Sequence, residues 1–167
     1  MKKYWTENLD GWDGLDYVKL LGVPMRKSRL GPVVDLRPLA LERTVASALI
    51  RSRIPLSGHE VRFLRKTVGL SLDKFARKLG LTSGAIFHWE KAANDRLVPI
   101  NEVGVRILCA EELGVEMSAK LSHLIGIGPE VLTLEITRPR SPRERRLRVA
   151  KDSDSKESAK KQRSTHR

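Results

Sequence analysis

Apolar residues recur every three or four positions through the middle of the chain, and this spacing predicts a series of short helices. Most of these segments open with proline, serine or threonine, and two of them close with glycine, as helix ends often do. The expected helices span about 39–53, 57–69, 71–80 and 82–91, with one or two more over about 101–113 and 118–125.

The pattern alternates at both ends of this helical stretch, which is typical of strands. Residues 17–23 and 32–36 are predicted to be two short strands, and the basic segment 24–31 between them is a loop or a further strand. Residues 131–137 alternate as well, and this strand could pair with the N-terminal ones. Residues 138–167 hold twelve bases, four acids and few apolar side chains, so we expect them to be disordered.

The segment from Ser71 to Glu90 has the signals of a helix-turn-helix, in which two short helices cross steeply and the second lies in the DNA major groove. Gly80 supplies the tight turn, and Ala76 is small enough for the two backbones to approach. Just upstream, Ser57-Gly58-His59-Glu60 is the sequence of a capping box. Apolar residues at positions 72, 75, 79, 81, 86 and 89 are expected to close the core of this unit.

Residues 57–92 resemble the helix-turn-helix of the lambda and 434 repressor and Cro superfamily, the Xre family. The family's usual pattern is Arg-x-x-x-Gly-Leu, then Ser/Thr-x-x-x-x-Ala-x-x-x-Gly-Val/Leu-Ser/Thr, then Ile-x-x-Trp/Leu-Glu. The matching segments here are Arg65 to Leu70, Ser71 through Thr82, and Ile86 to Glu90, and Lys91-Ala92 stands where Asn-Gly often follows. A wider resemblance, through Pro55 to Lys66, is to MqsA-type antitoxins and their regulator relatives, but the N-terminal zinc-binding cysteines of those antitoxins are absent from this sequence.

This resemblance implies a mainly α fold: a four- to five-helix Cro-like helix-turn-helix domain, a small β-containing module before it and a disordered basic C-terminal tail after it. The expected divisions are an N-terminal β-rich module (1–37), a connecting amphipathic helix (38–56), an Xre-type DNA-binding domain (57–125), a strand (126–137) and the tail (138–167).

The resemblance also assigns the DNA contacts. Base contacts are expected from Ser83, Gly84, Phe87 and His88. Phosphate contacts are expected from Arg65, Ser71, Lys74, Thr82 and Lys91, with Arg77 and Lys78 as further candidate cations. The base-contacting set holds no Arg, Asn or Gln, the side chains that pair with bases through two hydrogen bonds, so we expect DNA shape to contribute to recognition.

Three other residues of this region have structural roles in the prediction. In the family, the positions of Arg65 and Glu90 form an ion pair beneath the recognition helix, and Trp89 is expected in the core. For Phe87 there is an equal alternative to DNA contact, which is packing against the next helix or a dimer partner.

The charge balance agrees with a polyanionic partner. The chain has 32 Lys and Arg against 20 Asp and Glu, a formal net charge of +12. Half of this excess lies in residues 116–167, so net charge alone does not locate a binding site. Residues 57–91, however, hold seven bases and three acids, which places positive charge on the helix-turn-helix segment.

Several other classes of protein are not favoured. The single cysteine, Cys109, excludes an intrachain disulfide and a cysteine-based zinc site, and its apolar neighbours predict a buried thiol. The four histidines lack metal-ligand spacing, and residues 126–129 lack the Lys-Ser/Thr ending of a phosphate loop. We therefore expect no enzyme activity, no metal and no cofactor. The absence of a long apolar run and of a signal-peptide core predicts a cytoplasmic, nucleoid-associated protein.

The sequence thus predicts a sequence-specific regulator of the Xre type that binds double-stranded DNA, a repressor that could act on its own promoter. A homodimer is expected because one short recognition helix covers few base pairs. The alternative is an antitoxin of a type II toxin-antitoxin system that binds a toxin protein through residues 1–53. Trp5 and Trp12 would mark such a surface if they were exposed together, whereas burial would make them core residues. A third hypothesis is nonspecific nucleic-acid binding by the basic tail.

Overall fold

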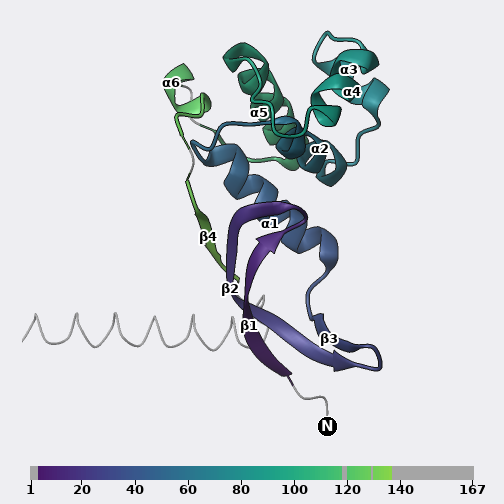
Figure 1. Ribbon diagram of the computed structural model, residues 1–167, viewed down its shortest axis with the longest axis vertical. Helices are drawn as coiled ribbons and strands as arrows, with labels where there is room; N and C mark the ends of the chain where they lie inside the picture. Colours follow the sequence, from purple (N-terminus) through teal and green to yellow (C-terminus); the bar gives the residue numbers. More distant parts are fainter. Residues whose placement is uncertain (1–3, 118–119, 129, 137–167) are drawn as a thin grey trace, which may run out of the picture. The chain divides into compact units, whose positions relative to one another are not determined.

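The computed structural model describes residues 4–117, 120–128 and 130–136. These residues belong to one compact unit, and the tail expected to be disordered, 138–167, lies outside them. Within the described residues the order of elements is β1 (Tyr4–Trp12), β2 (Leu15–Ser28), β3 (Gly31–Val34), α1 (Pro38–Arg51), α2 (Gly58–Thr67), α3 (Leu72–Lys78), α4 (Ser83–Lys91), α5 (Pro99–Leu113), α6 (Leu121–Leu124) and β4 (Leu132–Glu135) (Figure 1).

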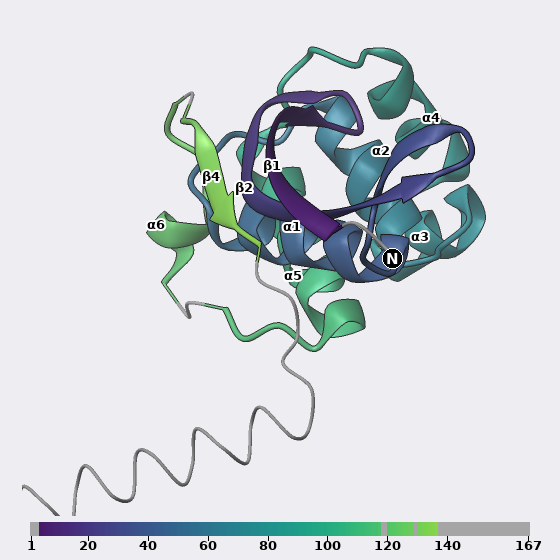
Figure 2. The same cartoon turned by 90° about the horizontal axis from the view of Figure 1, so that it is seen from below.

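β2 is the central strand of a four-stranded mixed sheet (Figure 2). β1 pairs with it in antiparallel fashion over almost its whole length. Along its other edge, the first half of β2 pairs with β4 in parallel, and the second half pairs with β3 in antiparallel fashion. The N-terminal strands and the strand near residue 135 therefore belong to one sheet, and β2 joins them.

The mainly α, Cro-like fold expected from the sequence is wrong. The described residues form a mixed sheet as well as six helices, and residues 24–28, whose structure was left open between a loop and a strand, extend β2. Residues 4–12 form a strand that the apolar pattern did not predict. The reason is that the pairing of β1 with β2 shifts register twice, between Glu7 and Leu9 and again between Asp10 and Trp12. Such bulges break the period of two that identifies a strand in a sequence.

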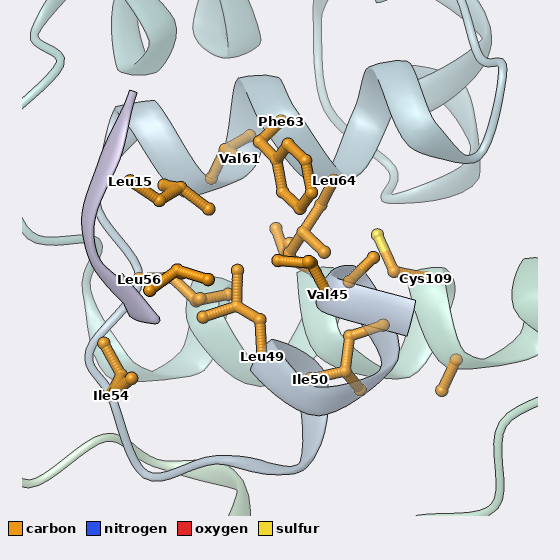
Figure 3. Packing of buried hydrophobic residues seen from close by; sticks show 14 of the residues in the cluster. Leu15, Val45, Leu49, Ile50, Ile54, Leu56, Val61, Phe63, Leu64 and Cys109 are labelled. Atoms are coloured by element: carbon orange, nitrogen blue, oxygen red, sulfur yellow. The ribbon is translucent and has the colours of Figure 1, made fainter. Parts of the chain in front are cut away.

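One cluster of buried apolar side chains joins the sheet to the helices. Leu15 of β2, Val45 and Leu49 of α1, and Val61 and Leu64 of α2 all belong to it (Figure 3). α1 lies at the centre of this cluster, because its buried positions recur every three or four residues and so form one continuous apolar face. None of the described helices is long and apolar enough to cross a membrane.

A second set of buried contacts is polar. Glu102 and Arg106 of α5 are fully buried and form an ion pair, with 2.9 Å between Arg106 Nη2 and Glu102 Oε1. Arg106 Nη1 also donates to the carbonyl oxygens of Leu49 and Ile50, each at 2.8 Å, and Nη2 donates to that of Ile54. The last carbonyls of a helix have no donor within the helix. Arg106 therefore satisfies the C-terminal end of α1 from inside the core.

Candidate nucleic-acid interface

α3 and α4 are two short helices joined by residues 79–82. Gly80 has a φ of +69°, which places it in the left-handed region that favours glycine. The N–H of Leu81, the next residue, donates to the carbonyl of Ala76 at 2.9 Å and closes the end of α3. Phe75, Ala76 and Ile86 are buried, so the two helices share an apolar contact below the turn.

Side-chain caps begin both helices. Thr82 Oγ1 accepts from the N–H of Ala85 at 3.2 Å, and Ser71 Oγ accepts from the N–H of Lys74 at 3.3 Å. These are the acceptors that the sequence predicts at the two positions. Each cap fixes where its helix starts, and thereby the direction in which the following side chains point.

Arg65 of α2 and Glu90 of α4 form a two-pronged ion pair. Arg65 Nε donates to Glu90 Oε1 at 2.6 Å, and Nη2 donates to Glu90 Oε2 at 2.9 Å. Arg65 Nη1 also donates to the carbonyl of Leu70 at 2.9 Å. The two side chains are only 13% and 10% exposed, and the hydrogen bond to Glu90 raises the pKa of Arg65. This pair fastens the last turn of α4 to the end of α2.

The other end of α2 holds the end of α4. The backbone at Gly58 lies so close to α4 that a Cβ atom there would sit 1.8 Å from the carbonyl oxygen of Trp89. Ser57 Oγ and the N–H of His59 both donate to the carbonyl of Ala93, at 2.7 and 2.9 Å. The predicted capping box is present as well, since Glu60 Oε2 accepts from the N–H of Ser57 at 2.7 Å.

The opposite face of α4 is open to solvent. Gly84, Phe87, His88 and Lys91 are exposed, Ser83 is half-buried, and Ile86 is the buried residue of this helix. The Phe87 side chain is 52% exposed and its ring meets that of His88 edge to face, with 6.1 Å between the ring centroids. The predicted base-contacting residues thus lie together along one helix that two anchors hold against α2.

The predicted phosphate-contacting residues around this face differ in how accessible they are to a ligand. Ser71, Lys74, Thr82 and Lys91 are exposed, while Arg65 is engaged with Glu90 beneath α4. Lys78 is paired with Glu112 of α5, with 2.8 Å between Nζ and Oε1, and this hydrogen bond raises the pKa of Lys78. Lys78 therefore holds α3 to α5 and is less available to a phosphate than Lys74.

The two N-terminal tryptophans do not form an exposed pair. Trp5 and Trp12 are each half-buried and pack against the apolar core, and Trp5 Nε1 donates to Glu7 Oε1 at 2.5 Å. Because both side chains pack against the core, they do not form the exposed aromatic pair that would mark a toxin-binding surface. Among the described residues no group of His, Cys, Asp or Glu is arranged to hold a metal ion.

Sequence reasoning gave no role to two sets of residues that the structure brings together. One is the buried pair Glu102 and Arg106, and the other is Tyr17, whose hydroxyl donates to Glu60 Oε1 at 3.0 Å. A Glu and an Arg four positions apart on a helix were a signal for the first pair, but their burial depends on α1.

Comparison of the chain with protein-family models, with curated proteins and with solved structures finds no match. Its function is therefore inferred from the geometry of the α4 surface and from the residues that this surface presents.

Proposed function

We propose that this protein is a sequence-specific transcriptional regulator that binds double-stranded DNA, with α4 lying in the major groove. The observation that carries the proposal is the exposed face of a short helix, Gly84 to Lys91, which is fixed from behind by the Arg65–Glu90 ion pair and by the close approach at Gly58. A surface that reads DNA must be both accessible and rigidly held, because base contacts depend on the placement of a few side chains.

The contacts follow from the chemistry of that face. Ser83 and His88 bring hydrogen-bonding groups to base edges, Gly84 allows close approach, and Phe87 offers an apolar surface to a thymine methyl. Phosphates are bound by Ser71, Lys74, Thr82 and Lys91, while Arg65 holds α4 in place through Glu90. A bidentate base contact contributes about 1–3 kcal/mol of discrimination, and the proposed base-contacting residues include no Arg, Asn or Gln to make one. Specificity therefore depends in part on DNA shape.

In this proposal the protein acts as a homodimer and represses by covering a promoter. Two copies of α4 on half-sites about one helical turn apart read twice as many base pairs as a single copy does. The resemblance of residues 57–92 to the Xre family supports the same proposal of a dimeric DNA-binding repressor.

Selection of bound sequences from a pool of random duplexes tests the proposal, and we expect one motif to be enriched. On that motif, the double variant Ser83→Ala/His88→Ala should bind at least about tenfold more weakly than wild type, because it loses side-chain contacts to bases. Its affinity for random duplex should change little. The matched control, Ser47→Ala/His123→Ala, removes the same residue types from α1 and α6 and should bind like wild type.

Two outcomes would contradict the proposal. If the Ser83→Ala/His88→Ala variant binds the motif as tightly as wild type, α4 is not the reading helix. If no motif is enriched and removal of residues 138–167 abolishes binding, the basic tail binds nucleic acid without sequence preference.

A further inference from the structure

The hairpin formed by β2 and β3 carries a concentration of positive charge that the proposed α4 contact does not use. Arg26, Lys27 and Arg29 are all exposed, and residues 25–34 contain no acidic side chain. Arg26 is paired with Asp35 beyond the end of β3, with 3.4 Å between Nε and Oδ1. Lys27 and Arg29 are therefore the two cations directed from this hairpin toward a partner.

The tip of the hairpin is ordered by its own hydrogen bonds. Ser28 Oγ donates to the carbonyl of Gly31 at 2.8 Å and accepts from the N–H of Leu30 at 3.2 Å. At the base, Met25 is buried in the core opposite Val34, and the N–H of Asp35 donates to the carbonyl of Pro24 at 2.7 Å. The hairpin is thus an arm with a fixed base and a fixed tip, and it presents its side chains in defined directions.

Leu30 occupies the end of this arm and is fully exposed, with a relative accessibility of 101%. Because the Leu30 side chain beside Arg29 buries no apolar surface, it contributes no hydrophobic stabilisation to the fold. Exposed apolar residues at the tips of basic elements are used on DNA as wedges in the minor groove, where cations on either side bind the phosphates. The chemistry of the tip therefore fits a duplex, with charge for the backbone and an apolar group for the groove.

The position of the arm agrees with this partner. The two views show the hairpin extending to the same side of the described unit as α3 and α4, at the other end of the unit (Figures 1 and 2). The hairpin is therefore a surface separate from α4 on the described unit.

We propose that the β2–β3 hairpin is a second duplex-DNA contact, in which Lys27 and Arg29 bind phosphates across the minor groove and Leu30 packs into the groove. This inference rests on the proposed DNA-binding function and adds a contact separate from α4. It gives the protein a longer footprint than a recognition helix alone, and a larger share of its affinity becomes salt-dependent.

The test compares the salt dependence of binding for hairpin and control variants. The probe is a duplex of about 30 base pairs, roughly three helical turns, carrying the selected motif or, without one, a mixed sequence. Binding is followed by fluorescence anisotropy over a range of salt concentrations. The hairpin variant is Lys27→Gln/Arg29→Gln. The control, Lys19→Gln/Arg43→Gln, removes two exposed charges from β2 and α1 and matches the change in net charge.

Each phosphate contact contributes about 0.9 to the slope of log affinity against log salt. We expect the hairpin variant to lose about two from this slope and the control to keep the wild-type slope. Leu30→Ser should weaken binding without changing the slope. Hydroxyl-radical footprinting should show a protected minor-groove segment outside the α4 footprint that disappears in the hairpin variant. Thermal unfolding of each variant checks the fold, which these exposed side chains leave intact.

The outcomes separate this inference from the function on which it rests. If the hairpin variant keeps the slope and footprint of the control while Ser83→Ala/His88→Ala still weakens binding, the hairpin contact is wrong and the α4 contact stands. If wild type binds no duplex, both are wrong. Charge-dependent binding to anionic vesicles that the hairpin variant loses, with no change on DNA, would also overturn the inference.

Discussion

Tyr17 is a residue whose environment changes its chemistry. Its hydroxyl donates to Glu60, which is also the carboxylate of the α2 capping box. Burial raises the pKa of Tyr17 well above its usual value, and the charge of Glu60 and the hydrogen bond to it raise it further. The folded protein therefore keeps this phenol protonated at a pH where the unfolded chain has lost the proton.

This difference predicts how stability depends on alkaline pH. Above about pH 10 the unfolded chain binds fewer protons than the folded one, so the free energy of unfolding should fall by about 1.4 kcal/mol per pH unit from this group. In Tyr17→Phe the free energy of unfolding should fall less steeply with pH, because unfolding of this variant releases one proton fewer. Urea denaturation at several pH values between 9 and 11 measures it, and Tyr4→Phe on the half-exposed end of β1 is the control.

Equal pH dependence in Tyr17→Phe and wild type would contradict this account. Cys109 does not confuse the comparison, although burial and then the charge of Glu112 raise its pKa to about 12. The thiol is present in all three proteins, and its contribution cancels.

Single residues also show where sequence reasoning succeeded. The family pattern predicts the ion pair of Arg65 and Glu90. Rules that involve only three neighbouring residues predict the caps at Thr82 and Ser71. The pairing of Lys78 with Glu112 was missed because its partner comes from another helix. Local chemistry can be predicted from the chain, whereas partners brought together by packing cannot.

At the scale of elements, the start of α2 lies very close to the end of α4. A Cβ atom at Gly58 would overlap the carbonyl oxygen of Trp89, whereas one at Gly84 would meet nothing closer than Thr82 Oγ1 at 3.8 Å. Both glycines lie in helices, so the chain offers a matched pair of positions.

Gly58→Ala should therefore destabilise the protein, because α4 must move away from α2 to make room. We expect a loss of at least about 2 kcal/mol, as for overpacking in a core. Gly84→Ala should instead add about 0.5–1 kcal/mol, since alanine is the better helix former. Urea denaturation of the two variants gives the comparison, and a Gly58→Ala protein as stable as wild type would show that the two backbones are not in contact.

The helices were easier to predict than the strands. The boundaries of α2, α3 and α4 follow from caps, glycines and an apolar stripe within each segment. β1 was missed because its bulges remove the alternation, while the mainly α interpretation followed from the family resemblance of residues 57–92. The face of α4 was predicted residue by residue, but the β2–β3 hairpin was not, because segment 24–31 reads equally as a loop.

At the scale of the whole molecule, Arg106 connects elements that are far apart in the sequence. It bonds the end of α1, while its partner Glu102 accepts from the N–H of Gly126 at 2.9 Å. Arg96 adds a third charge, 3.6 Å from Glu102 Oε2. Glu102 Oε2 makes no hydrogen bond to any described residue, so the buried charge of Glu102 depends on these two arginines.

Arg106→Met should destabilise the protein by about 3–5 kcal/mol, because Glu102 stays charged in the core with only the more distant Arg96 beside it, and the carbonyls of α1 lose their donor. The exposed substitution Arg43→Met in α1 should change stability by no more than about 0.5 kcal/mol. Glu102→Leu/Arg106→Met removes both charges and should recover part of the loss. Chemical denaturation of the three variants measures the effects, and a single variant no worse than the double would contradict the account.

The parallel pairing of β2 with β4 has a consequence for how the protein is made. β2 is synthesised near the start of the chain, whereas β4 follows all six of the described helices. Until residues 132–135 leave the ribosome, the first half of β2 has no strand along the edge opposite β1. Helices α1 to α6 therefore emerge before β4 can cover that edge of β2 and complete the four-stranded sheet.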